Sequence, residues 1–172
     1  DFLCQQKDAK GQSLFQEDFL TYLQQLKFTC DIDAIPDGTV VFANQPLIRV
    51  TGPNIQAQLI ETALLNIMNF QTLIATKASR IKMAGNNKPL MDFGLRRAQE
   101  EGGLSASYAA YVGGTDSTSN TLAAMLYHIP VKGTHAHAWI MSHQDELTAF
   151  REYAKTMPVF CFYNYLKLLL FL

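Results

Sequence analysis

Apolar positions recur at helical spacing over two stretches in the first half of the chain. Residues 17–26 repeat phenylalanine and leucine three or four positions apart, which predicts a short amphipathic helix. A second run begins at Asn54 and continues to about Ala84. This run predicts a long, mostly buried helix, either continuous or broken near Asn69, that ends at residues 85–87.

Between these helices, the pattern changes to alternating and β-branched residues. Such runs occupy residues 28–32, 39–43 and 47–51, and turn sequences rich in Pro, Asp, Asn and Gly separate them. Each run is short enough to be a single strand. The chain from 28 to 51 therefore predicts a small antiparallel β unit before the long helix.

After residue 87, short strand-like and helical patterns alternate. The strands are expected at 89–93 and 129–131, and the helices at 105–112, 121–127 and 144–157. A polar, glycine-rich loop is expected at 113–120. Ser142-His143-Gln144-Asp145 resembles a capping box for the last helix, whose inward face is expected to carry Leu147, Phe150, Ala154 and Met157. Alternating strands and helices predict βα units with a parallel sheet.

These elements predict the α/β class, with an α+β amino-terminal part followed by the first βα units of an irregular, incomplete α/β barrel. Residues 1–87 are expected to form part of the amino-terminal α+β domain, with the small β unit and the long helix. Residues 88–158 are expected to form the first portion of the barrel. Residues 159–172 are an atypical apolar tail, too short for a membrane span of about 20 residues.

Composition narrows the class of protein and its partners. The chain has 172 residues, of which 48% are apolar and 17% charged, so it can bury a core. A formal net charge of -1 gives no general attraction to nucleic acid or to an anionic membrane, and neither is expected as a partner. The scattered cysteines show no CxxC spacing, which favours free thiols in a reducing compartment. We therefore expect a cytoplasmic protein.

Three loops of the second half carry candidate chemistry. Residues 93–97 offer an aromatic ring and two arginines, residues 113–120 are rich in hydroxyl groups, and residues 133–139 contain His135 and His137. In a parallel sheet, ligands collect at the carboxyl ends of the strands. The three loops are therefore the predicted ligand-binding region.

The histidines allow several interpretations. On a strand, His135 and His137 would share a face and could both bind a metal ion, as in a metal-dependent hydrolase. One imidazole could instead be a nucleophile or general base, because its pKa is near neutrality. Both could equally be hydrogen-bonded structural residues.

The residues of the first loop also have two interpretations. Arg96 and Arg97 suit a phosphate or carboxylate, since a guanidinium group donates two parallel hydrogen bonds, but such pairs also begin solvated helices. Phe93 is by default a core residue. Only its position before Gly94 and Arg96 suggests a surface on which a ring could stack.

Taken together, the motifs resemble the nicotinate phosphoribosyltransferase family. The resemblance rests on Asp92-Phe93-Gly94-Leu95-Arg96-Arg97, on Gly113-Gly114 with Thr118-Ser119-Asn120, and on Val131-Lys132-Gly133-Thr134-His135-Ala136-His137. Upstream, Lys27-Phe28-Thr29 and Ile35-Pro36-Asp37-Gly38 are also similar to that family. The resemblance covers about residues 14 to 158.

The resemblance implies an enzyme of NAD salvage. Such an enzyme joins nicotinic acid to phosphoribosyl pyrophosphate and releases nicotinate mononucleotide and pyrophosphate. ATP would be a co-substrate, hydrolysed through a transient phosphohistidine, and Mg²⁺ would shield the pyrophosphate. The full-length enzyme is expected to be a homodimer.

Roles for individual residues follow from the same resemblance. The Gly-Thr-x-Ala-His pattern, with Gly133 and Thr134 in the substrate site, makes His137 the phosphorylated catalytic residue and leaves His135 at a variable position. Phe93 would stack on the pyridine ring.

Two further roles concern the anionic parts of the substrates. Arg96 would hold a phosphate or the substrate carboxylate, with Arg97 as a helper. Ser119 stands where related nicotinamide-using enzymes carry an aspartate. A serine favours nicotinate, because an aspartate would repel the carboxylate of that substrate.

The chain departs from the family at both ends. It lacks the amino-terminal segment whose aromatic residue reaches the partner subunit's site, and it lacks the acidic and glycine-rich motifs of the carboxyl-terminal half. Residues 159–172 do not match, and our hypothesis is a frameshifted or misannotated end. We expect no measurable phosphoribosyl transfer by this chain alone. The alternative is an inactive fragment that acts only as an interaction piece.

Overall fold

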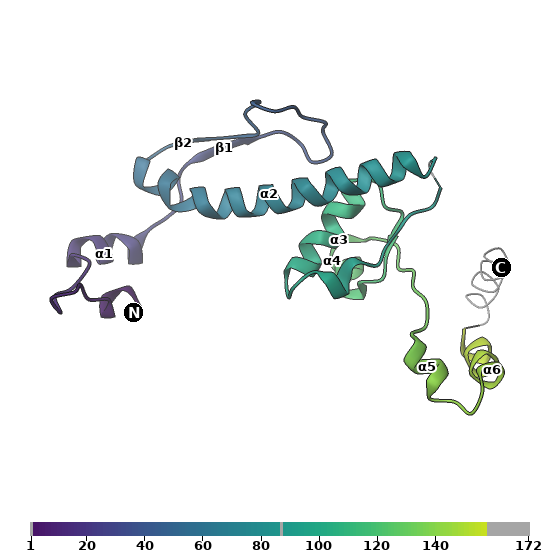
Figure 1. The fold of residues 1–172 in the computed structure, drawn as a ribbon. Helices are drawn as coiled ribbons and strands as arrows, with labels where there is room; N and C mark the ends of the chain where they lie inside the picture. The colour runs from purple at the N-terminus through teal and green to yellow at the C-terminus, as the bar shows by residue number, and fades with distance from the viewer. Residues whose placement is uncertain (1, 87, 158–172) are drawn as a thin grey trace. The chain divides into compact units, whose positions relative to one another are not determined.

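The computed structural model of the protein describes residues 2–86 and 88–157 (Figure 1). Helices and two small sheets alternate along the chain, which confirms the α/β class. The chain divides into two compact units, Asp1–Asn69 and Phe70–Leu172. The boundary expected after residue 87 stays a prediction, because one helix crosses residue 69 and belongs to both units. The apolar tail at 159–172 lies outside the described residues.

The first unit begins with helices and continues into a β-hairpin. Its elements before the long helix are η1 (Leu3–Gln5), α1 (Glu17–Gln25), β1 (Asp31–Ala34) and β2 (Ile48–Thr51). β1 and β2 pair antiparallel, with Asp31 opposite Thr51 and Ala34 opposite Ile48. The predicted helix at 17–26 and the antiparallel β unit are therefore confirmed.

Two strand predictions in this unit were inaccurate. β1 begins at Asp31, three residues later than the predicted start, and residues 39–43 form no strand. In that run, Val40 is 81% and Phe42 is 72% exposed. A strand needs a neighbouring backbone to accept and donate its hydrogen bonds, and no described segment pairs with residues 39–43.

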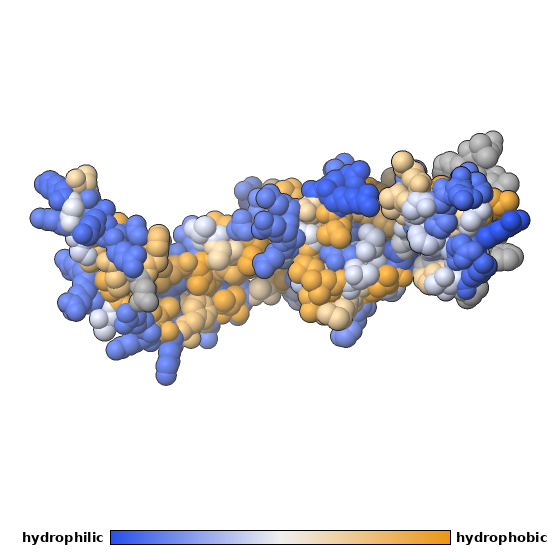
Figure 2. Space-filling model, turned by 90° about the horizontal axis from the view of Figure 1, so that it is seen from below, coloured by the Kyte–Doolittle hydropathy of each residue, from blue (hydrophilic) through white to orange (hydrophobic). Residues whose placement is uncertain are grey.

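The long helix α2 (Asn54–Ala84) is continuous through Asn69, so the alternative of two helices is wrong. Its expected burial is also wrong. Gln56 and Ala78 are buried, whereas Leu59, Leu65 and Leu73 are 48%, 62% and 62% exposed. Orange, apolar side chains reach the surface over large parts of the face drawn in Figure 2. The apolar spacing determined a helix, but the described chain covers little of it.

The second unit follows the helix with short strands and helices. These are β3 (Met91–Asp92), η2 (Gly94–Arg97), α3 (Gly102–Val112), β4 (Ser117–Thr118), α4 (Thr121–Tyr127), α5 (His137–Met141) and α6 (Glu146–Thr156). β3 and β4 pair in parallel, with Asp92 opposite Thr118. Thr118 also forms a parallel bridge with Val131. The predicted parallel arrangement is therefore confirmed.

The strands themselves differ from those predicted. Ser117–Thr118 is a strand within the stretch expected to be a polar loop, whereas residues 129–131 contribute a single bridge. Ser117 and Thr118 are both fully buried. Thr118 can be buried here because its backbone pairs on both sides and its hydroxyl group has partners. The buried Ser117 Oγ has no such partner among the described residues.

Small residues form the core of this unit. Ala109 and Ala110 of α3, Ala123 and Ala124 of α4, and Ile129 are buried. Small side chains let helices and strands approach closely. The approach is closest at Gly113, where a Cβ atom would lie 2.3 Å from the carbonyl oxygen of Ala75 in α2.

The last two helices also required corrections. Asp145 caps α6, since its Oδ1 accepts a hydrogen bond from the Thr148 backbone N–H at 2.8 Å. The capping box predicted at Ser142 is wrong, because Ser142 ends α5, a helix that the sequence pattern did not predict. On α6, Phe150 and Ala154 are half-buried as expected, but Leu147 and Met157 are exposed and Ala149 is buried instead.

Candidate functional site

The first candidate loop leaves β3 and exposes its chemistry. Phe93 is 44% exposed and is therefore not a core residue. Arg96 and Arg97 are exposed within η2 and form no ion pair with any described residue. An accessible ring beside two unpaired guanidinium groups can accept a flat, negatively charged ligand.

The second candidate residue, Ser119, lies beside this loop. Because Asp92 is opposite Thr118 in the parallel pair, the next residues, Phe93 and Ser119, emerge together at the carboxyl ends of β3 and β4. The Ser119 backbone N–H donates to the Asp92 carbonyl oxygen at 3.0 Å, and its Oγ donates to the same oxygen at 3.2 Å. The structure thus brings two of the predicted site residues side by side.

The third loop begins at the same edge. The Thr118 N–H donates to the Pro130 carbonyl oxygen at 3.0 Å, and the Lys132 N–H donates to the Thr118 carbonyl oxygen at 3.1 Å. Gly133 and Thr134 therefore leave the edge next to Ser119. A Cβ atom built at Gly133 would meet nothing within 4 Å, so this part of the loop borders open space.

His135 and His137 lie in different surroundings. The centre of the His135 ring lies 5.4 Å from that of Phe150 and 4.9 Å from that of Tyr153, both on α6. Its buried Nδ1 has no hydrogen-bond partner among the residues that the structure describes. His137 is exposed and is the first residue of α5. No hydrogen bond, ion pair or ring contact joins the His137 side chain to another described residue.

The expectation that both histidines share one face of a strand is wrong, because residues 133–136 form no strand and His137 begins a helix. Within residues 2–86 and 88–157, no three His, Cys, Asp or Glu side chains gather in a way that could hold a metal ion. The metal-dependent hydrolase interpretation required both histidines on one face of a strand, and the described residues do not have that arrangement.

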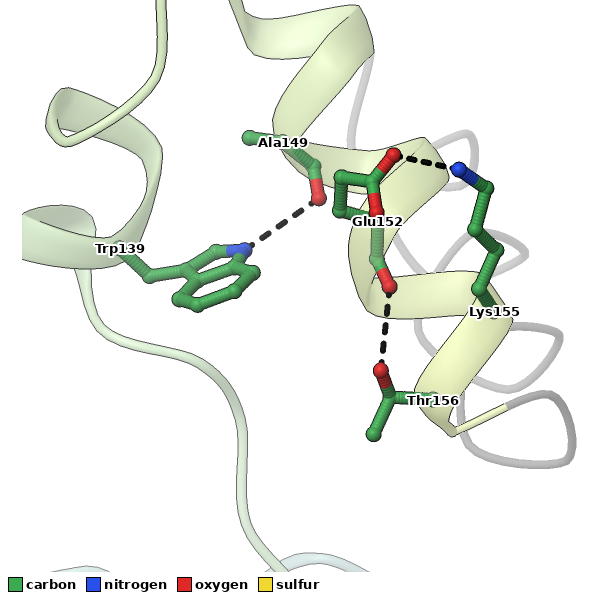
Figure 3. A network of polar contacts seen from close by, with 5 residues as sticks. All are labelled: Trp139, Ala149, Glu152, Lys155 and Thr156. Atoms are coloured by element: carbon green, nitrogen blue, oxygen red, sulfur yellow. Dashed lines mark hydrogen bonds and ion pairs between the residues drawn. The ribbon is translucent and has the colours of Figure 1, made fainter.

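Contacts between α5 and α6 hold this end of the third loop (Figure 3). The Trp139 Nε1–H donates to the carbonyl oxygen of Ala149 at 3.3 Å. The centre of the Trp139 ring lies 4.6 Å from that of His143. Further along α6, Lys155 pairs with Glu152 at 2.5 Å. Trp139 and His135 thus anchor the histidine segment to α6, while His137 stays accessible.

Asp92 organises the first two loops, a role that was not predicted from the sequence. Its Oδ1 accepts a hydrogen bond from the Gly94 N–H at 2.8 Å, and its Oδ2 accepts from Ser107 Oγ and Thr118 Oγ1, each at 2.8 Å. The available signal was an aspartate directly before Phe93. The two hydroxyl residues stand 15 and 26 positions away in the sequence and gave no local sign of this contact.

A second carboxylate holds the polar loop in place. Asp116 Oδ2 accepts from Lys82 Nζ at 2.6 Å and from the Leu90 N–H at 2.7 Å. These hydrogen bonds, the one from Lys82 first, lower the pKa of Asp116 below its usual value. Asp116 Oδ2 therefore ties α2 to the backbone just before β3, beside the site.

No helix of the described chain has both the length and the apolar character needed to cross a bilayer.

Comparison with known proteins identifies the family. Residues 5–69 match the model of the nicotinate phosphoribosyltransferase (NAPRTase) N-terminal domain. The chain is 49% identical over 143 residues to the nicotinate phosphoribosyltransferase of Bacillus subtilis, covering 83% of this chain and 29% of that protein. It is 48% identical over 130 residues to the Caenorhabditis elegans enzyme of the same name, covering 74% of this chain and 23% of the relative.

The fold agrees with these sequence matches. The crystal structure of human nicotinic acid phosphoribosyltransferase superposes with a TM-score of 0.69 and 42% sequence identity, over 74% of this chain and 26% of the human chain. The chain thus spans less than a third of the length of these relatives. Over that length, the sequence and the fold show that the chain belongs to the nicotinate phosphoribosyltransferase family.

Proposed function

We propose that this chain supplies the nicotinate-recognising loops of an enzyme that forms nicotinate mononucleotide and pyrophosphate from nicotinic acid and phosphoribosyl pyrophosphate. The observation that carries the proposal is the juxtaposition of Phe93 and Ser119 at one sheet edge, with unpaired Arg96 and Arg97 in the adjoining turn. Membership of the family supports the reaction itself.

Each of these side chains suits one part of nicotinate. The exposed Phe93 ring offers a flat apolar surface to the pyridine ring. Arg96 can donate two parallel hydrogen bonds to a carboxylate or phosphate, with Arg97 beside it. Ser119 now donates to the Asp92 carbonyl oxygen, and rotation of its hydroxyl hydrogen would let it donate to the nicotinate carboxylate instead.

His137 is the proposed phosphoryl acceptor for coupled ATP hydrolysis. A ring nitrogen would attack the γ-phosphorus of ATP, forming an N–P bond while the bond to the β-phosphate oxygen breaks and ADP leaves. Water would later cleave the N–P bond and release phosphate. The exposure of His137 supports this role, and so does the open space at Gly133 beside the exposed Thr134.

Mg²⁺ does not fit a protein-built site in this part of the enzyme. The described residues contain no group of acidic or imidazole ligands that could hold it, and both carboxylate oxygens of Asp92 already accept hydrogen bonds. Mg²⁺ that is held mainly by phosphate oxygens and water needs few protein ligands. The ion would therefore arrive bound to ATP or to the pyrophosphate.

A hybrid enzyme tests the proposal. In the Bacillus subtilis relative, the matched segment is replaced by the matching residues of this chain, and nicotinate mononucleotide is measured with and without ATP. We expect ATP-stimulated product formation that Phe93→Ala or Arg96→Ala lowers about ten- to hundredfold in kcat/KM for nicotinate, since each removes a substrate contact. The labelled γ-phosphate of ATP should become attached to His137.

Controls separate recognition from general damage. Arg49→Ala removes another exposed arginine, one paired with Asp33 in the first unit, and should leave kcat/KM unchanged. The purified 172-residue chain alone should give no product. Normal nicotinate use by the Phe93→Ala and Arg96→Ala hybrids would contradict the proposed recognition, and product formed by the chain alone would contradict the need for further chain.

The exposed apolar surface supports the second candidate, an interaction piece. A groove of about 470 Å³ between the end of the hairpin and α2 is lined by apolar residues that include Leu47, Val50, Leu64 and Met68. Such a piece would associate with a full-length family member, which could itself be a homodimer. Co-purification with that protein, in the absence of activity from the hybrid, would favour this function.

A further inference from the structure

We propose that Asp92 is a positioning residue, whose carboxylate sets the turn carrying Phe93 and Arg96 against the strand end carrying Ser119. The geometric part of this inference stands on contacts within the second unit. Its consequence for nicotinate binding rests on the proposed function.

One oxygen of the carboxylate holds the turn. Asp92 Oδ1 accepts the Gly94 N–H at 2.8 Å, directly after Phe93, whose backbone (φ -114°, ψ 22°) leaves the extended conformation. A Cβ atom on residue 94 would lie 3.1 Å from this oxygen, so glycine permits the close approach. The bond therefore determines where the chain turns out of β3 and the direction in which η2 starts.

The other oxygen is held by two buried hydroxyl groups. Ser107 on α3 is 1% exposed, Thr118 on β4 is 0% exposed, and both donate to Asp92 Oδ2 at 2.8 Å. The backbone carbonyl of Asp92 also accepts both hydrogen bonds from Ser119. Asp92 thus joins the turn, α3 and β4, and it contacts the residues on both sides of the candidate site.

The surrounding hydrogen bonds require a carboxylate and not an amide. Asn120 donates its backbone N–H to Thr118 Oγ1 at 3.1 Å and its side-chain N–H to Ser107 Oγ at 3.4 Å. Both hydroxyl oxygens are therefore already acceptors, and their hydrogens need an acceptor of their own. An amide has one acceptor oxygen in place of two. It would leave either the Gly94 N–H or at least one buried hydroxyl hydrogen without its acceptor, which is costly in a buried site.

The first test makes the same change, Asp→Asn, at position 92 and at a control position of the full 172-residue chain. The backbone amides of each variant are then followed by NMR. Asp92→Asn should shift the Gly94 and Ser119 amide resonances and speed hydrogen exchange at Gly94 about tenfold or more, with the helical circular dichroism retained. Asp33→Asn changes an exposed aspartate of the first unit and should leave both amides unaffected. Unchanged Gly94 and Ser119 amides in folded Asp92→Asn would overturn the inference.

If Asp92→Asn does not fold, two other variants test the same inference. Ser107→Ala and Thr118→Val each keep the Gly94 N–H and its acceptor Oδ1 but remove one of the two hydrogen bonds that hold Oδ2, so either should also speed exchange at Gly94. No such effect in these folded variants would overturn the positioning role. Unfolding by all three substitutions would also overturn it, because the carboxylate would then maintain the whole unit and not the turn.

In the hybrid enzyme, Asp92→Asn should raise the KM for nicotinate about tenfold while kcat changes less, because misplaced Phe93 and Arg96 weaken substrate binding. A fall in kcat alone would contradict the role. The two proposals fail separately: a Gly94 response without any nicotinate activity removes the proposed function, and activity without a Gly94 response removes the positioning role of Asp92.

Discussion

Single carboxylates connect segments of the second unit that are distant in sequence. Asp116 receives hydrogen bonds from Lys82 of α2 and from the Leu90 backbone, and its own N–H donates to the Leu90 carbonyl oxygen at 2.8 Å. Asp92 does the same for the turn, α3 and β4. At this scale, Phe93, Arg96 and His137 are exposed and accessible, and the carboxylates beside them hold the surrounding segments through hydrogen bonds.

The ion pair between Lys82 and Asp116 predicts a pH dependence. The pKa of Asp116 is lower in the folded chain than its ordinary value of 3.8, so its stabilisation is present above that value and is lost as the pH falls through the folded pKa. Asp116→Asn should therefore reduce stability to urea at pH 7 but hardly at pH 2. In Lys82→Gln, the Asp116 carboxyl resonance should titrate at a higher pH than in the unmodified chain. A pH-independent loss would contradict this assignment.

At the scale of elements, close approach at small residues determines how α2 and α3 meet. Gly113 follows α3 directly, and a Cβ atom there would lie 2.3 Å from Ala75 O and 2.9 Å from both Ala75 Cα and Ala78 Cβ. Most of these are backbone atoms, which cannot move without displacing a helix. The sequence showed a glycine that ends a helix, but it did not show what lies against it.

Gly113→Ala should therefore lower the free energy of unfolding by about 1–3 kcal/mol, the usual cost of overpacking. Denaturant unfolding followed by circular dichroism measures the change. Gly102→Ala is the matched control, because a Cβ atom at Gly102, at the start of the same helix, meets nothing within 4 Å. That control should be neutral or stabilising by up to about 1 kcal/mol, since alanine favours helix over glycine. Equal losses at both positions would refute the packing argument.

At the scale of the whole molecule, the described chain leaves much apolar surface uncovered. Large apolar side chains of α2 are exposed in each unit, among them Leu59 and Leu65 in the first and Leu73 and Met83 in the second. Contiguous exposed apolar surface usually marks an interaction site or a tendency to aggregate.

We expect the purified chain to associate in a concentration-dependent manner, and Leu65→Lys or Leu73→Lys to weaken this association at least several-fold, because each places a charge on the exposed apolar surface. Analytical ultracentrifugation over a range of concentrations measures it. Thr76→Lys adds the same charge at an exposed polar position of α2 and should change little. A chain that stays monomeric at high concentration would contradict the expectation.

The sequence by itself determined α1, the span of α2, α4, the antiparallel hairpin and the motif residues of the candidate site, because these depend on local spacing and turn residues. Tertiary structure alone decided that Ser117–Thr118 is a strand, that His135 packs against α6 while His137 is exposed, and that Asp92 joins three elements. The physical reason is that each of these depends on hydrogen bonds or contacts between residues far apart in the chain, and local periodicity carries no record of such partners.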